Sequence, residues 1–212
     1  MKAVAAATAA ALISVQIALY REISPYMDEI FHIRQAQRYC SGDYMTYDPK
    51  ITTPPGLYIL SLLMYKLIDV MRDVECSVTF LRATNGLISL LLLPLLHAIR
   101  ESLYPKEATN SIHTVVTFLY PIGAFYFGLY YTDSASALML LLSYYLSCSM
   151  RLSDHGAIRG IGLALTSMFA ILCRQTNAVW LLFITGAFFE SDSSSLPFSF
   201  CLFLSHLSCL FS

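Results

Sequence analysis

The sequence predicts an all-α membrane protein in which several membrane-spanning helices form a bundle. Of the 212 residues, 57% are apolar and only 13% are charged, whereas about 25% of the residues in an average soluble domain carry charge. The mean hydropathy is +0.61, and the apolar residues gather in runs of the length that a bilayer requires. The net charge is −1 and no basic block is present, so we expect no nucleic-acid partner.

The chain begins with an apolar run and continues into its longest polar stretch. Ala3–Tyr20 is apolar throughout and is predicted to be a retained signal-anchor span. Residues 21–56 follow as a long polar loop. Within it, Ser24 and Pro25 fit the N-cap and the first position of a helix. Turn residues at 41–43 predict where that helix ends.

One face of this predicted helix is polar. Asp28, His32, Gln35 and Tyr39 follow one another at intervals of four, three and four residues, which places them on the same side of a helix. Glu29 lies about 100° further around. Asp28 and Glu29 are therefore adjacent in sequence but are predicted to point in different directions.

The next apolar run, Leu57–Met71, is short and is interrupted by Lys66 and Asp69. It fits either a membrane span or a helix that lies in the interface. The interruptions favour the interfacial alternative, although Arg72 and Arg82 are placed where they could flank a crossing.

The remaining apolar runs predict the other spans. The basic residues of loops 100–111 and 151–159 predict that both loops are cytosolic.

If Leu57–Met71 does not cross, four polar segments share the opposite face: Asp28-Glu29, 52–56, Thr132-Asp133 and 174–177. The predicted spans are 80–99, Ile112–Tyr131, Ser134–Met150, Gly160–Cys173 and Ala178–Phe189.

Asp28 and Glu29 are the candidate catalytic residues. A carboxylate can accept the proton of a substrate hydroxyl as that hydroxyl attacks. A solvated helix start would show the same pair, because the helix dipole favours negative charge there. His32 is a candidate substrate-binding residue, although a histidine in this position is more often a structural hydrogen-bonding partner.

Further candidates lie at the ends of later spans. Asp133 interrupts an apolar stretch, and an ionisable group near a membrane core indicates a function, although a turn at the interface would also contain one. Arg174 offers a planar set of donors suited to phosphate, and an interfacial arginine at a helix end is the alternative. The candidate substrate-binding residues are His32, Thr53, Asp133, Arg174, Gln175 and Asn177.

The cysteines and the acidic residues give no sign of a metal site. No two cysteines stand in a CxxC pattern, and no HxxxH or DxD occurs. We therefore expect no metal and no cofactor, and we interpret the cysteines as small apolar residues. The six are Cys40, Cys76, Cys148, Cys173, Cys201 and Cys209.

Four segments, taken in order, resemble the endoplasmic-reticulum alpha-1,2-glucosyltransferase family. They are 25–40 (PYMDEIFH and QAQRYC), 48–58 (DPKITTPPGLY), 130–136 (YYTDSAS) and 173–180 (CRQTNAVW). The likeness covers roughly residues 15–189. That family adds the last glucose to the lipid-linked oligosaccharide for protein N-glycosylation, so the resemblance implies a multi-span glycosyltransferase of the C superfamily in the endoplasmic reticulum membrane.

The resemblance also implies substrates and roles. The donor would be dolichyl-phosphate-glucose, and the acceptor would be the dolichyl-diphosphate-linked oligosaccharide. The polar loop would face the lumen, and the spans would contact membrane lipids. Related enzymes use an acidic residue of the first lumenal loop as the base, and the residue at that position here is Asp28 or Glu29. We favour Asp28 because it shares a helical face with His32, and Arg174 is the candidate for the donor phosphate.

The C-terminal part departs from the family. Ala178–Phe189 is 12 residues long, about 18 Å as a helix, against a hydrocarbon core of ~30 Å. We expect residues 1–189 to be the N-terminal portion of a truncated enzyme and 190–212 to be an atypical tail. This chain alone would then be inactive or unstable. The alternative to an enzyme is a non-catalytic membrane protein that modulates a channel or a glycosyltransferase complex.

Overall fold

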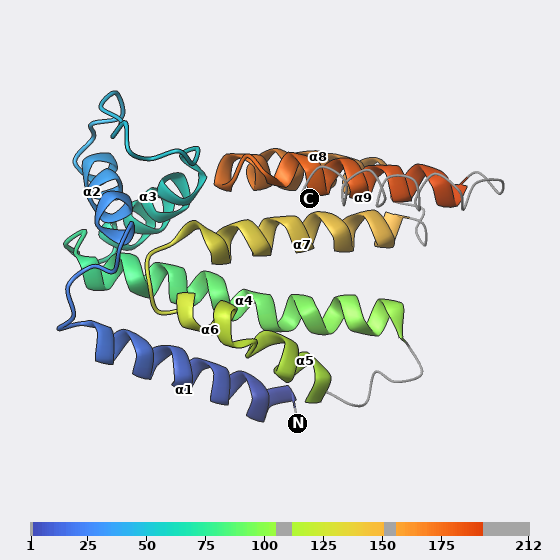
Figure 1. Cartoon of the computed structure of the whole chain (residues 1–212), viewed down its shortest axis with the longest axis horizontal. Coiled ribbons are helices and arrows are strands. Elements are labelled where there is room, and N and C mark those ends of the chain that lie inside the picture. The colour runs from blue at the N-terminus through green and yellow to red at the C-terminus, as the bar shows by residue number, and fades with distance from the viewer. Residues whose placement is uncertain (1, 105–111, 151–155, 193–212) are drawn as a thin grey trace, which may run out of the picture.

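The computed structural model describes residues 2–104, 112–150 and 156–192, and every regular element within these ranges is an α-helix. The long helices run side by side, and two shorter helices lie across one end of the bundle (Figure 1). This confirms the predicted all-α fold class and is compatible with a helical membrane protein. The long helices are α1 (Lys2–Tyr20), α4 (Val78–Leu103), α7 (Thr132–Met150), α8 (Gly156–Cys173) and α9 (Asn177–Asp192).

Within the described part of the chain, α4 is the one helix that is long and apolar enough to cross a bilayer. It has 26 residues, which corresponds to about 39 Å. Its first turn is capped by the hydroxyl of Ser77, which accepts a hydrogen bond from the Phe80 amide at 3.3 Å. Two shorter apolar helical segments, Ala7–Tyr20 and Gly160–Cys173, accompany it.

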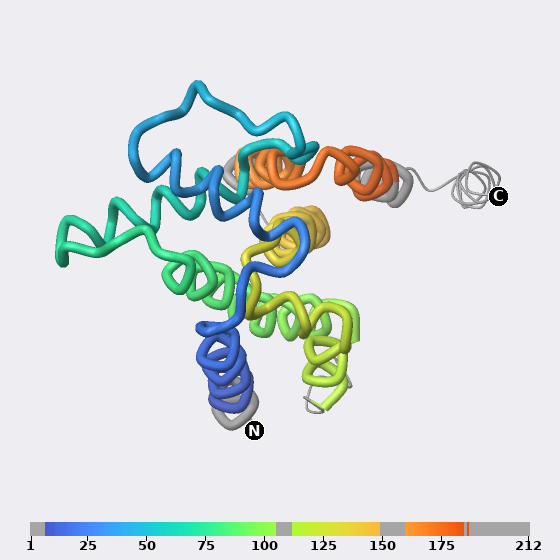
Figure 2. The backbone as a smooth tube through the Cα atoms, turned by 60° about the vertical axis from the view of Figure 1, so that its left-hand side comes forward, coloured from blue at the N-terminus to red at the C-terminus, as the bar shows by residue number. Residues whose placement is uncertain are grey.

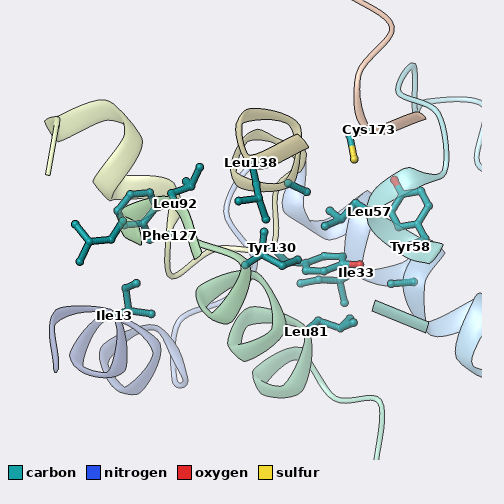
Figure 3. Close-up of a cluster of buried hydrophobic side chains, with 14 of the residues drawn as sticks. Ile13, Ile33, Leu57, Tyr58, Leu81, Leu92, Phe127, Tyr130, Leu138 and Cys173 are labelled. Atoms are coloured by element: carbon teal, nitrogen blue, oxygen red, sulfur yellow. The ribbon is translucent and has the colours of Figure 1, made fainter. Parts of the chain in front are cut away.

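The helices α4 and α7 form the middle of the bundle. α7 packs against α4, α8 and α9, and α1 packs against α4. Figure 3 shows Ile13 of α1, Leu92 of α4 and Leu138 of α7 among the buried side chains between them. Polar side chains also pair inside the bundle, because Ser89 donates a hydrogen bond to Ser134 at 2.8 Å. Such pairs satisfy hydroxyl groups where no water is present.

Close helix packing at the edge of the bundle depends on glycine. A Cβ atom added at Gly86 would lie 2.7 Å from the side chain of Ile13 in α1. α1 and α4 can therefore approach closely only because that side chain is absent. A similar approach at Gly128 brings the α6–α7 connection against Gln16.

Residues 21–77, here called the cap, fold over one end of the bundle. The cap contains α2 (Glu29–Cys40) and α3 (Gly56–Asp69), which pack against each other, while α3 also touches α8. Gln35 is fully buried and fastens the loop after α2, because its amide nitrogen donates to the Thr46 carbonyl at 2.9 Å and its oxygen accepts from the Asp48 amide at 3.0 Å. Figure 2 shows this loop arching above the helices of the cap.

A disulfide joins Cys40, at the end of α2, to Cys76, just before α4. The prediction that these two cysteines are merely small apolar residues was wrong. The bond holds the chain before α3 and the chain after it at the same end of the bundle. This arrangement agrees with the alternative in which Leu57–Met71 does not cross the membrane.

Two predicted elements were wrong in their bounds. α2 begins at Glu29 and not at Ser24, and its N-cap is Asp28. The single span predicted for Ile112–Tyr131 is instead two short helices, α5 (Ile112–Phe118) and α6 (Pro121–Tyr126). Pro121 explains this break, since proline disfavours the helical conformation in the residue before it.

The last predicted span is longer than expected. α9 covers 16 residues, Asn177–Asp192, where the sequence predicted a helix over Ala178–Phe189. It therefore extends past the boundary at residue 190 that we expected for an atypical tail. Residues 193–212 of that predicted tail lie outside the described residues.

Candidate functional site

A buried ion pair between Glu29 and Arg82 holds the cap onto the bundle. Both side chains are almost completely buried, with relative exposures of 0% and 1%, and Nη2 of Arg82 lies 2.7 Å from Oε2 of Glu29. Nε of the same arginine donates to Oε1 at 2.8 Å. The contact is therefore bidentate, the geometry in which a guanidinium binds a carboxylate best.

The remaining polar atoms of this ion pair are also occupied. The backbone amides of Tyr26 and Tyr130 donate to the Glu29 carboxylate at 2.9 and 2.8 Å. Nη1 of Arg82 donates to the backbone carbonyls of Tyr20 and Ile23. The ion pair thus joins the end of α1, the start of α2, α4 and the α6–α7 connection.

These contacts decide the charge state of Glu29. Burial acts to raise its pKa, but the hydrogen bonds from Arg82 and from the amides of Tyr130 and Tyr26 outweigh burial and hold the pKa below its usual value. Such a carboxylate stays ionised and has no free lone pair directed at solvent. Glu29 therefore has the features of an anchor.

Asp28 is placed quite differently, although it is the next residue. It is exposed and caps no amide of α2 with its side chain. The preceding Met27 has a φ of +44°, in the left-handed region, and the Glu29 amide donates to the Tyr26 carbonyl at 2.9 Å. This tight turn directs Glu29 into the protein and leaves Asp28 at the surface of the cap.

His32 lies one helical turn after Asp28 and is buried against tyrosines. Its Nδ1 is 2.6 Å from the hydroxyl of Tyr58, and its ring meets the ring of Tyr131 edge-on at 5.7 Å. Tyr131 in turn donates its hydroxyl to the Tyr26 carbonyl at 2.7 Å. The imidazole is therefore held between α2, α3 and the start of α7.

Burial and four charged residues together set the pKa of His32. Burial is the main reason that its pKa lies below the usual value, and the charge of Arg174 lowers it further. The carboxylates of Asp28, Asp133 and Glu29 act in the opposite direction. The charges of Asp28, Asp133 and Arg174 thus all act on one histidine, and Asp133 and Arg174 are themselves in contact.

Asp133 and Arg174 form a second ion pair, and this pair is open to its surroundings. Nη1 of Arg174 lies 3.0 Å from Oδ1 of Asp133, and the side chains are 41% and 35% exposed. Arg174 follows the last residue of α8, and its amide donates to the Ala170 carbonyl at 3.0 Å. The guanidinium retains further N–H donors that a phosphate could use.

The cap packs directly against the residues that precede Arg174. A Cβ atom added at Gly56 would lie 2.5 Å from the carbonyl carbon and oxygen of Leu172 and 2.6 Å from the amide of Cys173. Only glycine permits this approach of backbone to backbone. The Pro-Pro-Gly sequence at 54–56 therefore fixes the position of α8 relative to the cap.

The other predicted substrate-binding residues differ in how exposed they are and in whether other protein groups already bind them. Gln175 is exposed beside Arg174. Asn177 is buried, and its amide nitrogen donates to Ser136 at 2.7 Å and to the Ala170 carbonyl at 2.8 Å, so it connects α7, α8 and α9. Thr53 is partly buried, and its carbonyl accepts a hydrogen bond from the Tyr47 hydroxyl at 2.5 Å.

A groove of about 410 Å³ opens beside the Asp133–Arg174 pair. Its walls come from α4, α5, α6 and the first half of α7, and Asp133 and Arg174 both line it. Among the described residues, no group of three or more His, Cys, Asp or Glu side chains is placed to bind a metal ion.

Arg82 was missed as a site residue by the sequence reasoning, which considered it only as a flank of the preceding run. A signal was present, since Arg82 belongs to an apolar helix that is long enough to cross a membrane. An ionisable residue in such a helix requires a partner. Its partner, Glu29, is 53 residues away, and local periodicity cannot identify a contact at that separation.

The chain is similar in sequence to several known proteins. The chain is 39% identical over 195 residues to an Arabidopsis thaliana protein, 38% over 176 residues to one from Neurospora crassa and 36% over 173 residues to one from Rattus norvegicus. Each is named Dol-P-Glc:Glc(2)Man(9)GlcNAc(2)-PP-Dol alpha-1,2-glucosyltransferase. These matches cover 86%, 76% and 76% of this chain.

The chain spans only 37%, 22% and 35% of the lengths of these three relatives. No solved structure matches it significantly. The DIE2/ALG10 family matches residues 22–197, a range that contains both ion pairs, the groove and the cap from residue 22 onward. This chain therefore belongs to the DIE2/ALG10 family.

Proposed function

We propose that this chain carries the catalytic loop of an inverting alpha-1,2-glucosyltransferase. The enzyme transfers glucose from dolichyl-phosphate-glucose to the terminal glucose of the dolichyl-diphosphate-linked oligosaccharide. The observation that carries the proposal is that the carboxylate of Asp28 is exposed while Glu29 beside it is buried in an ion pair. The partly exposed Asp133–Arg174 pair, whose charges also act on His32, supports it. The names of the related glucosyltransferases support the assignment of donor and acceptor.

In this proposal Asp28 is the general base. It accepts the proton of the acceptor 2-hydroxyl while the hydroxyl oxygen attacks C1 of the donor glucose. The new O–C1 bond forms as the bond between C1 and the phosphate oxygen breaks, and dolichyl phosphate leaves with both electrons of that bond. The β-linked donor gives an α-linked product, so base and leaving group act on opposite faces of the sugar.

Arg174 is the proposed partner of the leaving phosphate. Its guanidinium stabilises the negative charge that develops as the bond to C1 breaks. Asp133 uses one N–H group of Arg174 and holds the guanidinium in place. His32 is buried and hydrogen-bonded to Tyr58, and it orients the groups around the reacting atoms.

Glu29 is not the base in this scheme. Its carboxylate is ionised, but four hydrogen bonds from Arg82, Tyr26 and Tyr130 already occupy it. A base must also approach the proton that it removes to within hydrogen-bonding distance, and a fully buried side chain cannot do so. Glu29 instead positions the turn that presents Asp28.

We propose that the protein spans the endoplasmic reticulum membrane several times, with the cap in the lumen. The basic loops 100–111 and 151–159 support a cytosolic location for the opposite end. The disulfide between Cys40 and Cys76 supports the same orientation, because disulfides persist in oxidising compartments such as this lumen.

The test is glucose transfer from dolichyl-phosphate-glucose in a full-length enzyme that contains this segment. Asp28→Asn keeps the shape of the side chain but removes the proton acceptor. We expect turnover to fall by about 10²–10⁴-fold, with the donor KM nearly unchanged. Glu29→Gln should lower turnover less.

The control for this experiment is Asp73→Asn, at an exposed aspartate of the cap outside the site, which should leave turnover unchanged. Near wild-type turnover of Asp28→Asn would refute the proposed role. Loss of turnover in Glu29→Gln alone, with an unchanged yield of folded protein, would reverse the two roles. If both variants stay active, the base lies elsewhere and Asp133 is the next candidate.

A further inference from the structure

The groove beside Arg174 is apolar along most of its length. It is lined by Leu92 and Leu96 of α4, by Phe118 and Phe127, and by Leu140 and Leu141 of α7. The volume of about 410 Å³ lies within the range of roughly 300–1,000 Å³ that is typical of ligand sites. We call this feature the α4–α7 groove.

The α4–α7 groove has one charged end. Asp133 and Arg174 line it where α7 begins, and Leu141 lines it further along the same helix. Asp133 and Leu141 are eight residues apart on α7, which corresponds to roughly 12 Å at 1.5 Å per residue. The charged end is the end that carries the cap, so the groove leads from the candidate site toward the middle of the bundle.

The break between α5 and α6 contributes to the groove. Tyr120 has an extended backbone, with φ −52° and ψ 125°, and Pro121 begins α6. Tyr120 and Gly123 both line the groove. No atom lies within 4 Å of the position that a Cβ of Gly123 would occupy, so a larger side chain there meets open space.

We propose that the α4–α7 groove binds the first isoprene units of the polyprenyl-phosphate donor, with the donor phosphate at Arg174. This inference rests on the proposed glucosyltransfer, which requires a lipid whose phosphate is bonded directly to its isoprenoid chain. An apolar wall that ends at an exposed guanidinium complements both parts of such a molecule. A water-soluble sugar phosphate would leave the apolar wall without a partner.

The position of the phosphate is consistent with the Asp133–Arg174 pair. A guanidinium has five N–H donors, and Asp133 accepts from one of them. The partly exposed guanidinium can therefore bind phosphate oxygens while Asp133 keeps it oriented. Bound in this way, the isoprenoid chain extends away from the cap and leaves the sugar near Asp28.

The first experiment measures lipid binding without any glucose transfer. The 212-residue chain in nanodiscs is exposed to a polyprenyl phosphate that carries a photoreactive diazirine in its first isoprene units. We expect cross-links to peptides of α4 and α7, with competition by dolichyl phosphate. Dolichol, which lacks the phosphate, and phosphatidylglycerol should compete at least tenfold less well.

The matched variants are Gly123→Leu, which fills the groove, and Gly186→Leu, which adds the same side chain at another open helical position. Gly123→Leu should lower the labelling several-fold, and Gly186→Leu should leave it unchanged. Labelling that phosphatidylglycerol competes equally well, or that Gly123→Leu leaves intact, overturns the proposal. Stronger competition by dolichyl diphosphate than by dolichyl phosphate assigns the groove to the acceptor and also overturns it.

The second experiment uses the full-length enzyme and two donors, one with a dolichyl chain and one, the short donor, in which a methyl group replaces the isoprenoid chain. Gly123→Leu should raise the KM of the long donor by about tenfold through lost apolar burial, with kcat unchanged. The KM of the short donor should change less. An equal loss with both donors indicates a general structural defect and overturns the proposal.

The two experiments separate this inference from the proposed function. If competable labelling is found but no glucose is transferred, the groove remains a site for a polyprenyl phosphate and the proposed reaction fails. If transfer depends on Asp28 but the groove is not labelled, the reaction stands and the groove proposal fails.

Discussion

Two carboxylate–guanidinium pairs lie at the same end of the bundle, and they differ in almost every physical respect. Glu29 and Arg82 are buried, bidentate and surrounded by backbone donors and acceptors. Asp133 and Arg174 make a single contact and remain more than one third exposed. The same pairing of residue types therefore gives a fixed joint in one place and an available binding group in the other.

The difference follows from the cost of desolvation. A buried ion pair gains little over apolar packing, but the loss of one partner leaves an uncompensated charge in the interior. An exposed pair contributes about 0–1 kcal/mol, because water screens both charges. Glu29 and Arg82 should thus matter for folding, and Arg174 for ligand binding.

The largest predicted effect tests this contrast directly. Arg82→Ala should lower the free energy of unfolding by about 3–5 kcal/mol, whereas Arg174→Ala should change it by less than about 1 kcal/mol. Denaturant titration of the purified chain in detergent measures both values. Equal destabilisation by the two variants would show that the two pairs do not differ as the structure indicates.

Arg174→Ala should have its effect on the donor instead. The loss of a charge-assisted hydrogen bond corresponds to about 1.5–3 kcal/mol, which is roughly a 10–100-fold rise in donor KM. The kinetic assay with full-length enzyme serves for this comparison. An unchanged donor KM would remove Arg174 from the phosphate site.

A smaller effect is expected where the cap meets α8. Gly56→Ala places a methyl group 2.5 Å from backbone atoms of Leu172, and backbone cannot move aside as a side chain can. We expect a loss of about 1–3 kcal/mol in the free energy of unfolding, together with weaker donor binding because Arg174 is displaced. Gly186→Ala is the control, since its Cβ would meet nothing within 4 Å.

The smallest effect is on the pH dependence of stability. Burial, helped by Arg174, lowers the pKa of His32 from its usual 6.5, against the carboxylates of Asp28, Asp133 and Glu29. The unfolded chain therefore binds a proton at His32 more readily than the folded chain, and stability falls as the pH drops below 6.5. Glu29, whose folded pKa lies below 4.5, adds a further loss at more acidic pH.

Melting temperatures recorded between pH 7.5 and pH 4 check this prediction. His32→Gln should flatten the upper part of the profile, and His113→Gln, at an exposed histidine of α5, should not. A profile that His32→Gln leaves unchanged would mean that His32 does not cause the loss of stability below pH 6.5.

The sequence was sufficient for features that depend on local pattern. α7 and α8 are helices close to the predicted ranges. Asp28 and Glu29 point in different directions, as the helical phase of the two residues indicated. Hydrophobic periodicity and turn residues act within a single helix or turn, so they can be recognised in the sequence without knowledge of the fold.

Contacts between distant segments were beyond such reasoning. The pairing of Arg82 with Glu29 and the disulfide of Cys40 with Cys76 both depend on how the cap is placed on the bundle. The capping pattern at Ser24-Pro25 was overridden, because the buried contacts of Glu29 fix where α2 begins. The break at Pro121, in contrast, was visible in the sequence and should have been predicted.

The four segments that meet at the Glu29–Arg82 pair have a consequence for the order in which the protein is assembled. A chain is synthesised from its N-terminus, so Glu29 is made before Arg82 and long before Tyr130, which is 101 residues away. Until both have arrived, the carboxylate lacks the partners that stabilise its charge in the interior and has to remain hydrated. The turn that presents Asp28 can therefore take its final shape only after the α6–α7 connection is in place. Newly made protein should consequently acquire its reactive surface late, when the middle of the bundle has already formed.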